Sequence, residues 1–226
     1  NWPVLALLPG TVLLVAWLAR LLRQPATRST GRVLIVAGVL LGAGSVSVMH
    51  YSHWLTPAFA WLARREPPWN LTPIAKYDPT ARLRGWSQLG AAVGEVLATE
   101  RAAGRKPFIV TDDYQTASEI AFYCPGEPAV YCLQAVLGNR QSQYDIWPNP
   151  IRNAAQFIGR PCIYVGTLKP ELIGQGASAH VALRGARLAT TVEHRVRGHL
   201  YRVWPVYVCE EFAGLPPELS RPAEEY

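Results

Sequence analysis

The chain has 226 residues, of which 22 are basic and 16 are acidic, so its formal net charge is +6. Four of the basic residues lie in one short N-terminal segment, and the part of the chain from residue 64 onward is nearly neutral. A protein that binds nucleic acid needs clustered positive charge along the phosphate backbone, so this charge balance argues against a nucleic-acid partner.

Two apolar segments open the chain. They are Pro3–Ala19 and Val33–Ala63, and neither contains a formally charged residue. Because about 20 apolar residues suffice for a helix to cross the bilayer core, each segment predicts a transmembrane helix in contact with membrane lipids. The intervening residues 20–32 carry four arginines and no acidic residue. Residues 1–63 are therefore predicted to form a transmembrane helical hairpin.

The arginine-rich linker also predicts the orientation of the hairpin. Short basic loops stay on the cytoplasmic side, whereas long domains cross the membrane largely regardless of their charge. Both ends of the chain are then outside, and Trp54 and Trp61 belong to the outer interfacial belt. His50 and His53 have the spacing of a metal pair, but no nearby cysteine or carboxylate completes a site, so no metal is predicted.

Small residues mark one face of the second apolar segment. Gly38, Gly42 and Ser45 follow each other at helical spacing and would let another helix approach closely. That helix is either the first helix of this hairpin or a transmembrane helix that precedes this sequence. The opening Asn1-Trp2-Pro3 has no methionine and no basic signal-peptide region, which predicts a piece of a longer polypeptide.

The rest of the chain alternates between helical and extended patterns. Residues 64–80 are a proline-rich connector, residues 81–212 an α/β domain and residues 213–226 a flexible tail. In the α/β domain, apolar spacing and turn residues predict helices from Leu83 to Gly104, from Asp112 or Asp113 to Tyr123, and from Ile151 to Ile158, with strands at 107–111, 129–133, 162–165, 188–196 and 200–208.

This order of elements predicts the fold class. Strands that alternate with helices form parallel sheets with right-handed crossovers. The last two strands are joined at Arg197-Gly198 and read as an antiparallel β-hairpin at the sheet edge. The expected fold is α/β, with two transmembrane helices followed by a small, mostly parallel α/β sandwich domain that ends in a β-hairpin.

Four cysteines are present, and no two of them form a C-x-x-C pair that would indicate a zinc ribbon or redox motif. All lie in or beside apolar segments, which predicts core packing as small hydrophobic side chains. An outside location permits disulfides, and Cys124 with Cys132 is the first pair to test. The remaining two are Cys162 and Cys209.

Candidate ligand-binding residues follow two predicted strands, because ligands of open α/β sheets bind beyond the carboxyl ends of the strands. The candidates are Tyr114, Gln115, Tyr144, Asp145 and Trp147. Flat aromatic faces and hydrogen-bonding side chains suit a carbohydrate or a polar head-group. Two alternative roles are structural. Asp112 and Asp113 would cap the helix that follows the first strand, and Tyr144 and Trp147 would rest on the membrane interface.

Several enzyme classes lack their signatures here. No G-x-G-x-x-G follows the first strand, which disfavours a dinucleotide cofactor. The adjacent Asp112-Asp113 lacks the Asp-x-Asp spacing of a metal-bound sugar nucleotide site. The chain also lacks the G-x-S-x-G motif that would indicate a hydrolase. The residues predict no cofactor and give no support to a self-contained hydrolase.

A set of short motifs nevertheless resembles a known family. The motifs are Asn1-Trp2-Pro3, Asp78-Pro79, Gly85-Trp86, Thr111–Glu119, Phe122-Tyr123 and Gln143–Pro148. In this order and spacing they resemble the C-terminal portion of bacterial GT-C glycosyltransferases, the relatives of dolichyl-phosphate-mannose-protein mannosyltransferase and of the lipid A aminoarabinose transferase. The resemblance covers most of residues 1–165 and the hairpin only loosely.

The resemblance implies a multi-pass protein of the bacterial inner membrane whose globular domain lies on the periplasmic side. It implies transfer of a sugar from a polyprenyl-phosphate donor to a lipid, glycan or protein acceptor. The family's catalytic carboxylate lies in an early outer loop that this sequence does not contain, so the chain would supply the domain over the active-site cavity. The alternative is a non-catalytic, membrane-anchored sensor or binding domain outside the cell.

Overall fold

The computed structural model of the chain describes residues 4–67, 72–137, 141–167, 170 and 182–215. The chain divides into two compact units, residues 1–55 and residues 56–226. The sequence placed the end of the membrane segment at residue 63. Within this segment, residues 56–63 form a short helix, α3 (Thr56–Ala63), whose Ala63 packs with Ile74, Ala81 and Tyr201 in the second unit.

The first unit consists of helix α1 (Val4–Arg23), helix α2 (Arg28–His50) and the 3-10 turn η1 (Ser52–Leu55). Among the described residues, α2 is the one helix that is long and apolar enough to cross a membrane. Its 23 residues span about 34 Å at 1.5 Å per residue, close to the hydrocarbon thickness of a bilayer. That α1 also spans the membrane is a proposal.

Close approach between α1 and α2 occurs at Gly31. An ideal Cβ on Gly31 would lie 3.1 Å from the Cβ of Leu21 and 3.2 Å from a methyl group of Leu22. Gly38 and Gly42 have no such neighbour within 4 Å. At these two glycines, α2 therefore makes no close contact with the described part of α1.

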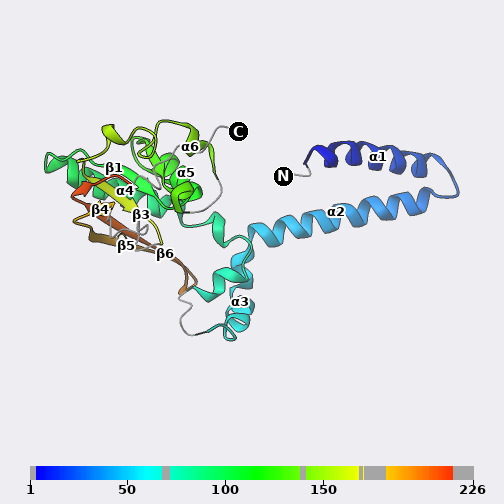
Figure 1. The fold of residues 1–226 in the computed structure, drawn as a ribbon. Coiled ribbons are helices and arrows are strands. Elements are labelled where there is room, and N and C mark those ends of the chain that lie inside the picture. The colour runs from blue at the N-terminus through cyan, green and yellow to red at the C-terminus, as the bar shows by residue number, and fades with distance from the viewer. Residues whose placement is uncertain (1–3, 68–71, 138–140, 168–169, 171–181, 216–226) are drawn as a thin grey trace. The chain divides into compact units, whose positions relative to one another are not determined.

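The second unit carries the α/β domain (Figure 1). Its helices are α4 (Trp86–Ala102), α5 (Tyr114–Tyr123) and α6 (Gln143–Ile146), and its strands are β1 (Phe108–Thr111), β2 (Val130–Cys132), β3 (Cys162–Val165), β4 (Leu183–Arg184), β5 (Arg187–Val196), β6 (His199–Cys209) and β7 (Glu211–Phe212). Short 3-10 turns are η2 (Pro73–Lys76), η3 (Ala81–Leu83), η4 (Gln134–Leu137) and η5 (Ala154–Gln156).

Five strands form one mixed sheet in the order β2-β1-β3-β6-β5, and β4 pairs with β7 in a second, two-stranded sheet. The β2-β1 and β1-β3 pairs are parallel, whereas β3-β6 and β6-β5 are antiparallel. The α/β class is therefore confirmed, and the sheet is mixed and partly parallel. The hairpin supplies two of the five strands, and β6 is an interior strand while β5 is at the edge.

Both faces of the central strands are buried. Ile109 and Ile163 pack with α4 and α5 on one face, while Phe108 and Tyr164 pack with Phe212 of β7 on the other. Strands covered on both faces read as continuous apolar runs instead of alternating patterns, which is why β1 and β3 were recognisable in the sequence. Figure 1 shows α4 and α5 beside the sheet.

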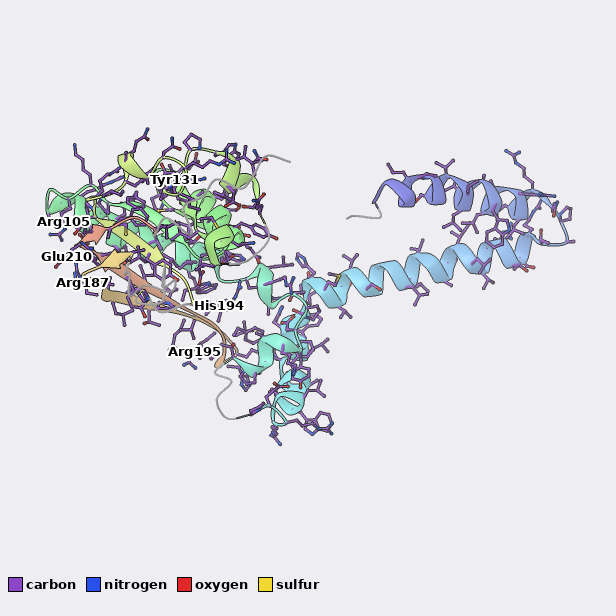
Figure 2. The ribbon with its side chains drawn as sticks, in the orientation of Figure 1. Arg105, Tyr131, Arg187, His194, Arg195 and Glu210 are labelled. Atoms are coloured by element: carbon purple, nitrogen blue, oxygen red, sulfur yellow. The ribbon has the colours of Figure 1, made fainter. Side chains whose placement is uncertain are left out.

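The hairpin turn has the backbone that its sequence requires. Arg197 and Gly198 both have positive φ values, 50° and 82°. Two successive positive φ values define the type I′ turn, whose twist matches that of the flanking antiparallel strands. Figure 2 shows His194 and Arg195 along this hairpin, and Arg105, Arg187 and Glu210 towards the opposite end of the domain.

Two predicted elements differ in the structure. The helix expected at 151–158 is reduced to η5, because the Asn149 side-chain oxygen accepts hydrogen bonds from the backbone amides of Ile151 (2.8 Å) and Arg152 (2.9 Å). Such side-chain bonds to the backbone compete with helix formation. The first helix of the domain was expected to begin at Leu83, but Leu83 lies in η3 before α4 and is exposed.

All four cysteines are buried and free, as core packing predicts, and no bridge joins Cys124 to Cys132. Burial raises the pKa of the Cys132 thiol to about 12. Cys162 and Cys209 face each other as register partners between β3 and β6. Contact with the Cys209 thiol, together with burial, raises the pKa of Cys162.

Candidate functional site

The sheet order creates a crevice at the carboxyl ends of β1 and β3. Strand β2 lies on one side of β1 and β3 on the other, so the chain reverses its direction of progress across the sheet at β1. Ligands of open α/β sheets bind outside the carboxyl ends of the strands at such a switch point. Asp112 and Asp113 follow β1 at this edge, and Gly166 and Thr167 follow β3.

Asp112 joins the two strand ends. Its carboxylate accepts hydrogen bonds from the backbone amide of Thr167 (2.7 Å), from the Thr167 hydroxyl (3.1 Å) and from the Tyr164 hydroxyl (3.4 Å). A Cβ on Gly166 would lie 2.6 Å from the Asp112 carboxyl carbon, so the approach requires glycine. Asp112 is buried and shapes the crevice floor.

Asp113 is the N-cap of α5. Its side chain accepts a hydrogen bond of 2.8 Å from the backbone amide of Thr116, and its backbone is extended. Of the two aspartates that the sequence offered as caps, Asp113 therefore has that role. The Thr111 hydroxyl donates to the Asp113 carbonyl at 2.8 Å and fixes the chain between β1 and α5.

Two adjoining clefts open at this edge of the sheet. The larger has a volume of about 610 Å³ and is lined by residues of η2, η3, α5 and β6, including Lys76, Asp78, Arg82, Gln115 and Arg202. The smaller, of about 320 Å³, holds the strand-end groups Asp112, Asp113, Gly166 and Thr167. Ala75 and Arg202 line both. We refer to the two together as the strand-end cleft.

Arg202 lies at the junction of the strand-end cleft. Its guanidinium carbon is 4.4 Å from the ring centre of Trp86 and 5.0 Å from that of Trp204. Burial lowers the pKa of Arg202, Asp113 and Glu119 raise it, and the like charge of Arg82 lowers it further. Its Nη1 atom is buried and has no hydrogen-bond partner among the described residues. The two indoles thus hold a partly desolvated cation at the cleft.

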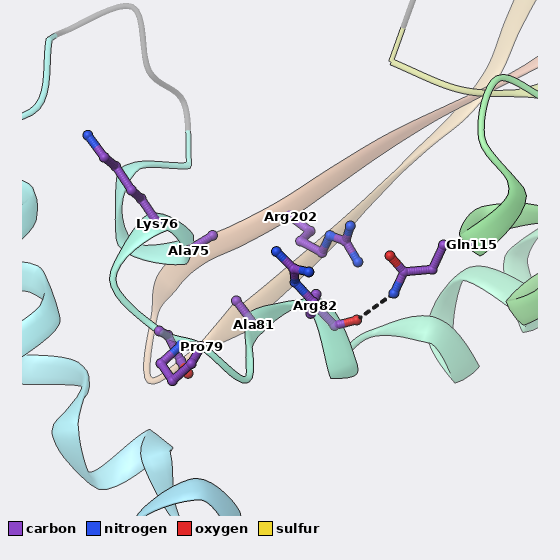
Figure 3. A pocket seen from close by; sticks show the side chains of 8 residues that line it. Ala75, Lys76, Pro79, Ala81, Arg82, Gln115 and Arg202 are labelled. Carbon is purple, nitrogen blue, oxygen red and sulfur yellow. Dashed lines mark hydrogen bonds between the residues drawn. The ribbon is translucent and has the colours of Figure 1, made fainter. Parts of the chain in front are cut away.

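The segment before α4 is fixed by its carbonyl groups and by a glycine. The backbone oxygen of Arg82 accepts hydrogen bonds from the Trp86 indole (2.8 Å) and from the Gln115 side chain (3.3 Å). Gly85 has φ = 84°, and a Cβ there would lie 2.8 Å from both His194 and Trp204. Glycine therefore allows η3 to reach the hairpin and places Arg82 in the cleft, as Figure 3 shows with Gln115 and Arg202.

The binding residues predicted from the sequence lie partly in the strand-end cleft and partly outside it. Gln115 lines the strand-end cleft. Tyr144 and Trp147 form an edge-to-face pair with ring centres 5.5 Å apart, and the Tyr144 hydroxyl lies 3.2 Å from the Ser118 hydroxyl on α5. Tyr114 is exposed at the start of α5, where its backbone amide donates to the Gln134 side chain. The structure does not bring these aromatic side chains into the cleft.

Asp145 has a local partner. Its Oδ2 accepts hydrogen bonds from the backbone amide of Ser142 (2.6 Å) and from the Ser142 hydroxyl (3.1 Å), as in a capping box at the start of α6. Its Oδ1 atom is buried and has no partner within the described part of the chain. This placement favours the local capping alternative over a substrate contact.

Sequence reasoning missed the basic side chains of the cleft. Arg82 and Arg202 are separated by most of the domain, and neither lies in a recognisable motif. The available signal was indirect: Arg202 precedes Trp204 on the same face of a strand, and Gly85-Trp86 follows Arg82 closely. Only the pairing of the hairpin with β3 brings these residues to one edge.

Within the segments that the structure describes, no group of three or more histidine, cysteine, aspartate or glutamate side chains is arranged to hold a metal ion. The cleft instead combines guanidinium groups, hydroxyls, an amide and a carboxylate around a space large enough for a small polar ligand. Such a set can hydrogen-bond hydroxyl groups and can attract an anion. No family model, curated protein or solved structure matches this chain.

Proposed function

We propose that the chain is the C-terminal part of a bacterial membrane glycosyltransferase that uses a polyprenyl-phosphate sugar donor. Its acceptor would be a lipid, a glycan or a protein. In this proposal the second unit is the outer domain over the active-site cavity, and the strand-end cleft binds the polar part of donor or acceptor. The catalytic carboxylate belongs to a part of the polypeptide that precedes this sequence.

One observation carries the proposal. Three of the motifs that resemble the GT-C family lie around the same cleft, although they are separate in the sequence. Asp78-Pro79 and Gln115 line its larger part, Asp112 and Asp113 line its smaller part, and Trp86 contacts Arg202 at the junction. Local packing needs no such convergence at the carboxyl edge of a sheet, where ligands bind in this class of fold.

The membrane part is consistent with a lipid-linked donor. Helix α2 has the length and apolar character to cross a bilayer, so the second unit begins within a few residues of a predicted membrane surface. A donor with a polyprenyl chain presents its sugar phosphate at that surface. We propose the extracytoplasmic side for the domain and a multi-pass topology for the whole polypeptide.

A substitution that fills the cleft tests the proposal. Ala75 lines both parts of the cleft, so Ala75→Phe in the full-length protein should lower sugar transfer from a polyprenyl-phosphate donor. Ala98→Phe, at an exposed position of α4, is the matched control and should keep the wild-type rate. Thermal melting of both variants separates a blocked cleft from an unfolded domain.

A membrane-anchored binding domain is the second candidate, favoured by the single membrane-length helix among the described residues. The two candidates make different predictions for the full-length protein. Transfer that falls only in the Ala75 variant supports the enzyme. A full-length protein that transfers no sugar but binds a sugar ligand supports the anchored binding domain, and equal transfer rates in both variants reject a role of the cleft in catalysis.

A further inference from the structure

The strand-end cleft contains two guanidinium groups without a paired carboxylate. Within the part of the chain that the structure describes, no ion pair joins Arg82 or Arg202 to an acidic residue. Three of the described acidic residues line the cleft, and all of them accept local hydrogen bonds: Asp78 from the Thr80 amide (2.8 Å) and hydroxyl (2.7 Å), Asp112 from Thr167, and Asp113 from the Thr116 amide. Two like charges that share one cleft repel each other unless an anion lies between them.

The position of Arg202 is fixed before any ligand arrives. Its guanidinium lies over the rings of both Trp86 and Trp204, and these two contacts limit its freedom to move. The Nη1 atom of Arg202 is buried and has no partner among the described residues, so the guanidinium is left with uncompensated charge. An anionic ligand in the cleft would meet the guanidinium at its other nitrogen atoms and compensate that charge.

Phosphate fits these requirements better than a carboxylate. It offers oxygens in several directions, so two guanidinium groups from different elements can each donate to it, and arginine binds it in a bidentate manner. The Asp113 side chain, which attracts Arg202 at longer range, is occupied as the cap of α5. The cleft of about 610 Å³ leaves room for a group attached to the phosphate.

We infer that Arg82 and Arg202 together bind the phosphate group of a phosphate monoester or diester in the strand-end cleft. This inference deepens the proposed function and rests on it for the source of the ligand, which is the phosphate head-group of a polyprenyl lipid or a soluble phosphate ester. Trp86 and Trp204 act as positioning residues that hold the Arg202 guanidinium.

Calorimetric titration of the whole chain, in nanodiscs of neutral lipid, tests this inference. The probes are inorganic phosphate and farnesyl phosphate, a short polyprenyl monophosphate. Arg202→Gln and Arg82→Gln should each weaken binding about tenfold or more, since each removes a hydrogen bond between charged groups. Arg152→Gln changes the net charge equally at an exposed position outside the cleft and should leave the affinity unchanged.

The two probes identify the source. Arginine-dependent binding of farnesyl phosphate but not of inorganic phosphate indicates a lipid head-group, whereas equal binding indicates that phosphate alone suffices. Because Arg82 is exposed, its variant keeps the test decisive if Arg202→Gln lowers the melting temperature. Binding of neither probe, or equal affinity in the Arg82 and Arg152 variants, would overturn the inference.

The outcome also separates this inference from the proposed function. Arginine-dependent phosphate binding by a protein whose full-length form transfers no sugar would keep the phosphate site and reject the glycosyltransferase. Sugar transfer by the full-length protein, with phosphate binding that ignores both arginines, would reject the phosphate site and keep the enzyme.

Discussion

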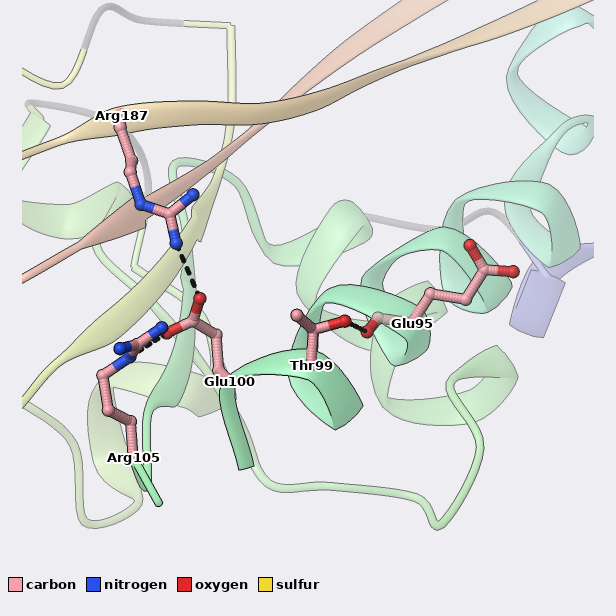
Figure 4. Close-up of polar contacts among 5 residues, drawn as sticks. All are labelled: Glu95, Thr99, Glu100, Arg105 and Arg187. Carbon is pink, nitrogen blue, oxygen red and sulfur yellow. Dashed lines mark hydrogen bonds and ion pairs between the residues drawn. The ribbon is translucent and has the colours of Figure 1, made fainter. Parts of the chain in front are cut away.

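Replacing Glu100 with glutamine should destabilise the α/β domain, because this carboxylate is buried between two arginines (Figure 4). The Glu100 side chain is only 2% exposed and ends helix α4. One oxygen accepts a hydrogen bond of 2.7 Å from Arg187 on β5, and the other accepts from Arg105 in the segment before β1. The three residues therefore connect the end of α4 to the edge strand β5 and to the segment that leads into β1.

The expected magnitude follows from the burial of the three groups. Glutamine keeps the volume and one acceptor oxygen, so the change mainly removes hydrogen bonds between charged groups, at about 1.5–3 kcal/mol. The Arg105 and Arg187 side chains are 48% and 57% exposed and can return to water. No buried charge is left unpaired, which keeps the cost below the roughly 3–5 kcal/mol of a broken buried pair.

For a domain of this size, that loss should lower the melting temperature by about 3–12 °C. Circular dichroism of the chain in detergent measures the shift. The matched control is Glu95→Gln, at an exposed position of the same helix, which should stay within about 0.5 kcal/mol of the wild type.

The pH dependence gives a second test. The hydrogen bond from Arg105, followed by the charges of both arginines, holds the pKa of Glu100 below its usual value of 4.5 against the opposing effect of burial. A carboxyl whose pKa is lower in the folded state stabilises the protein above its unfolded pKa, and this contribution is lost as the pH falls through the folded pKa. The wild type and Glu100→Gln should therefore differ most near neutral pH, and the difference should shrink as the pH falls below 4.5. Equal melting of the Glu95 and Glu100 variants at pH 7, or an undiminished difference at pH 3, would refute this reasoning.

Three further predictions address packing, capping and topology. Gly90→Ala should lower the free energy of unfolding by about 1–3 kcal/mol, because its Cβ would lie 2.6 Å from the carbonyl carbon of Tyr123; unchanged stability would mean that α4 and α5 do not approach each other so closely. Asp145→Ala should cost about 0.5–2 kcal/mol through loss of the α6 cap, and a denaturant titration that matches the wild type would contradict the capping role. A cysteine placed at Ser29 should react with an impermeant thiol reagent only from the cytoplasm, and one at Ser87 only from outside, while the buried native thiols react slowly; reversed labelling would reject the proposed orientation.

Much of the local structure followed from the sequence. The strand at 162–165 was predicted with its observed ends, because four consecutive apolar residues mark a strand covered on both faces. The hairpin followed from Arg197-Gly198, where the turn type depends on only two residues. The helix predicted at 151–158 failed because a single side chain, Asn149, competes for the backbone amides, which apolar periodicity does not reveal.

The candidate site was only partly predictable. Gln115 lines the strand-end cleft, a few residues after β1, and its role in binding a ligand stays a prediction. Tyr144 and Trp147 were expected at the same edge, but they pair with each other beside α5 and stay outside the cleft. Their loop follows β2, the outer strand of the sheet, and not the central strand where the chain changes direction.

The sequence by itself determined the membrane-length apolar helix, the α/β class, the apolar strands and the hairpin, since each depends on residues that are neighbours along the chain. Only the tertiary structure decided that β3 pairs with both β1 and β6. That pairing brings Asp112 to Thr167 and sets Arg202 against Trp86, across long separations in the chain. The order of the strands depends on how both apolar faces of the sheet are covered at the same time. This is a property of the packed domain, and no pattern of neighbouring residues reveals it.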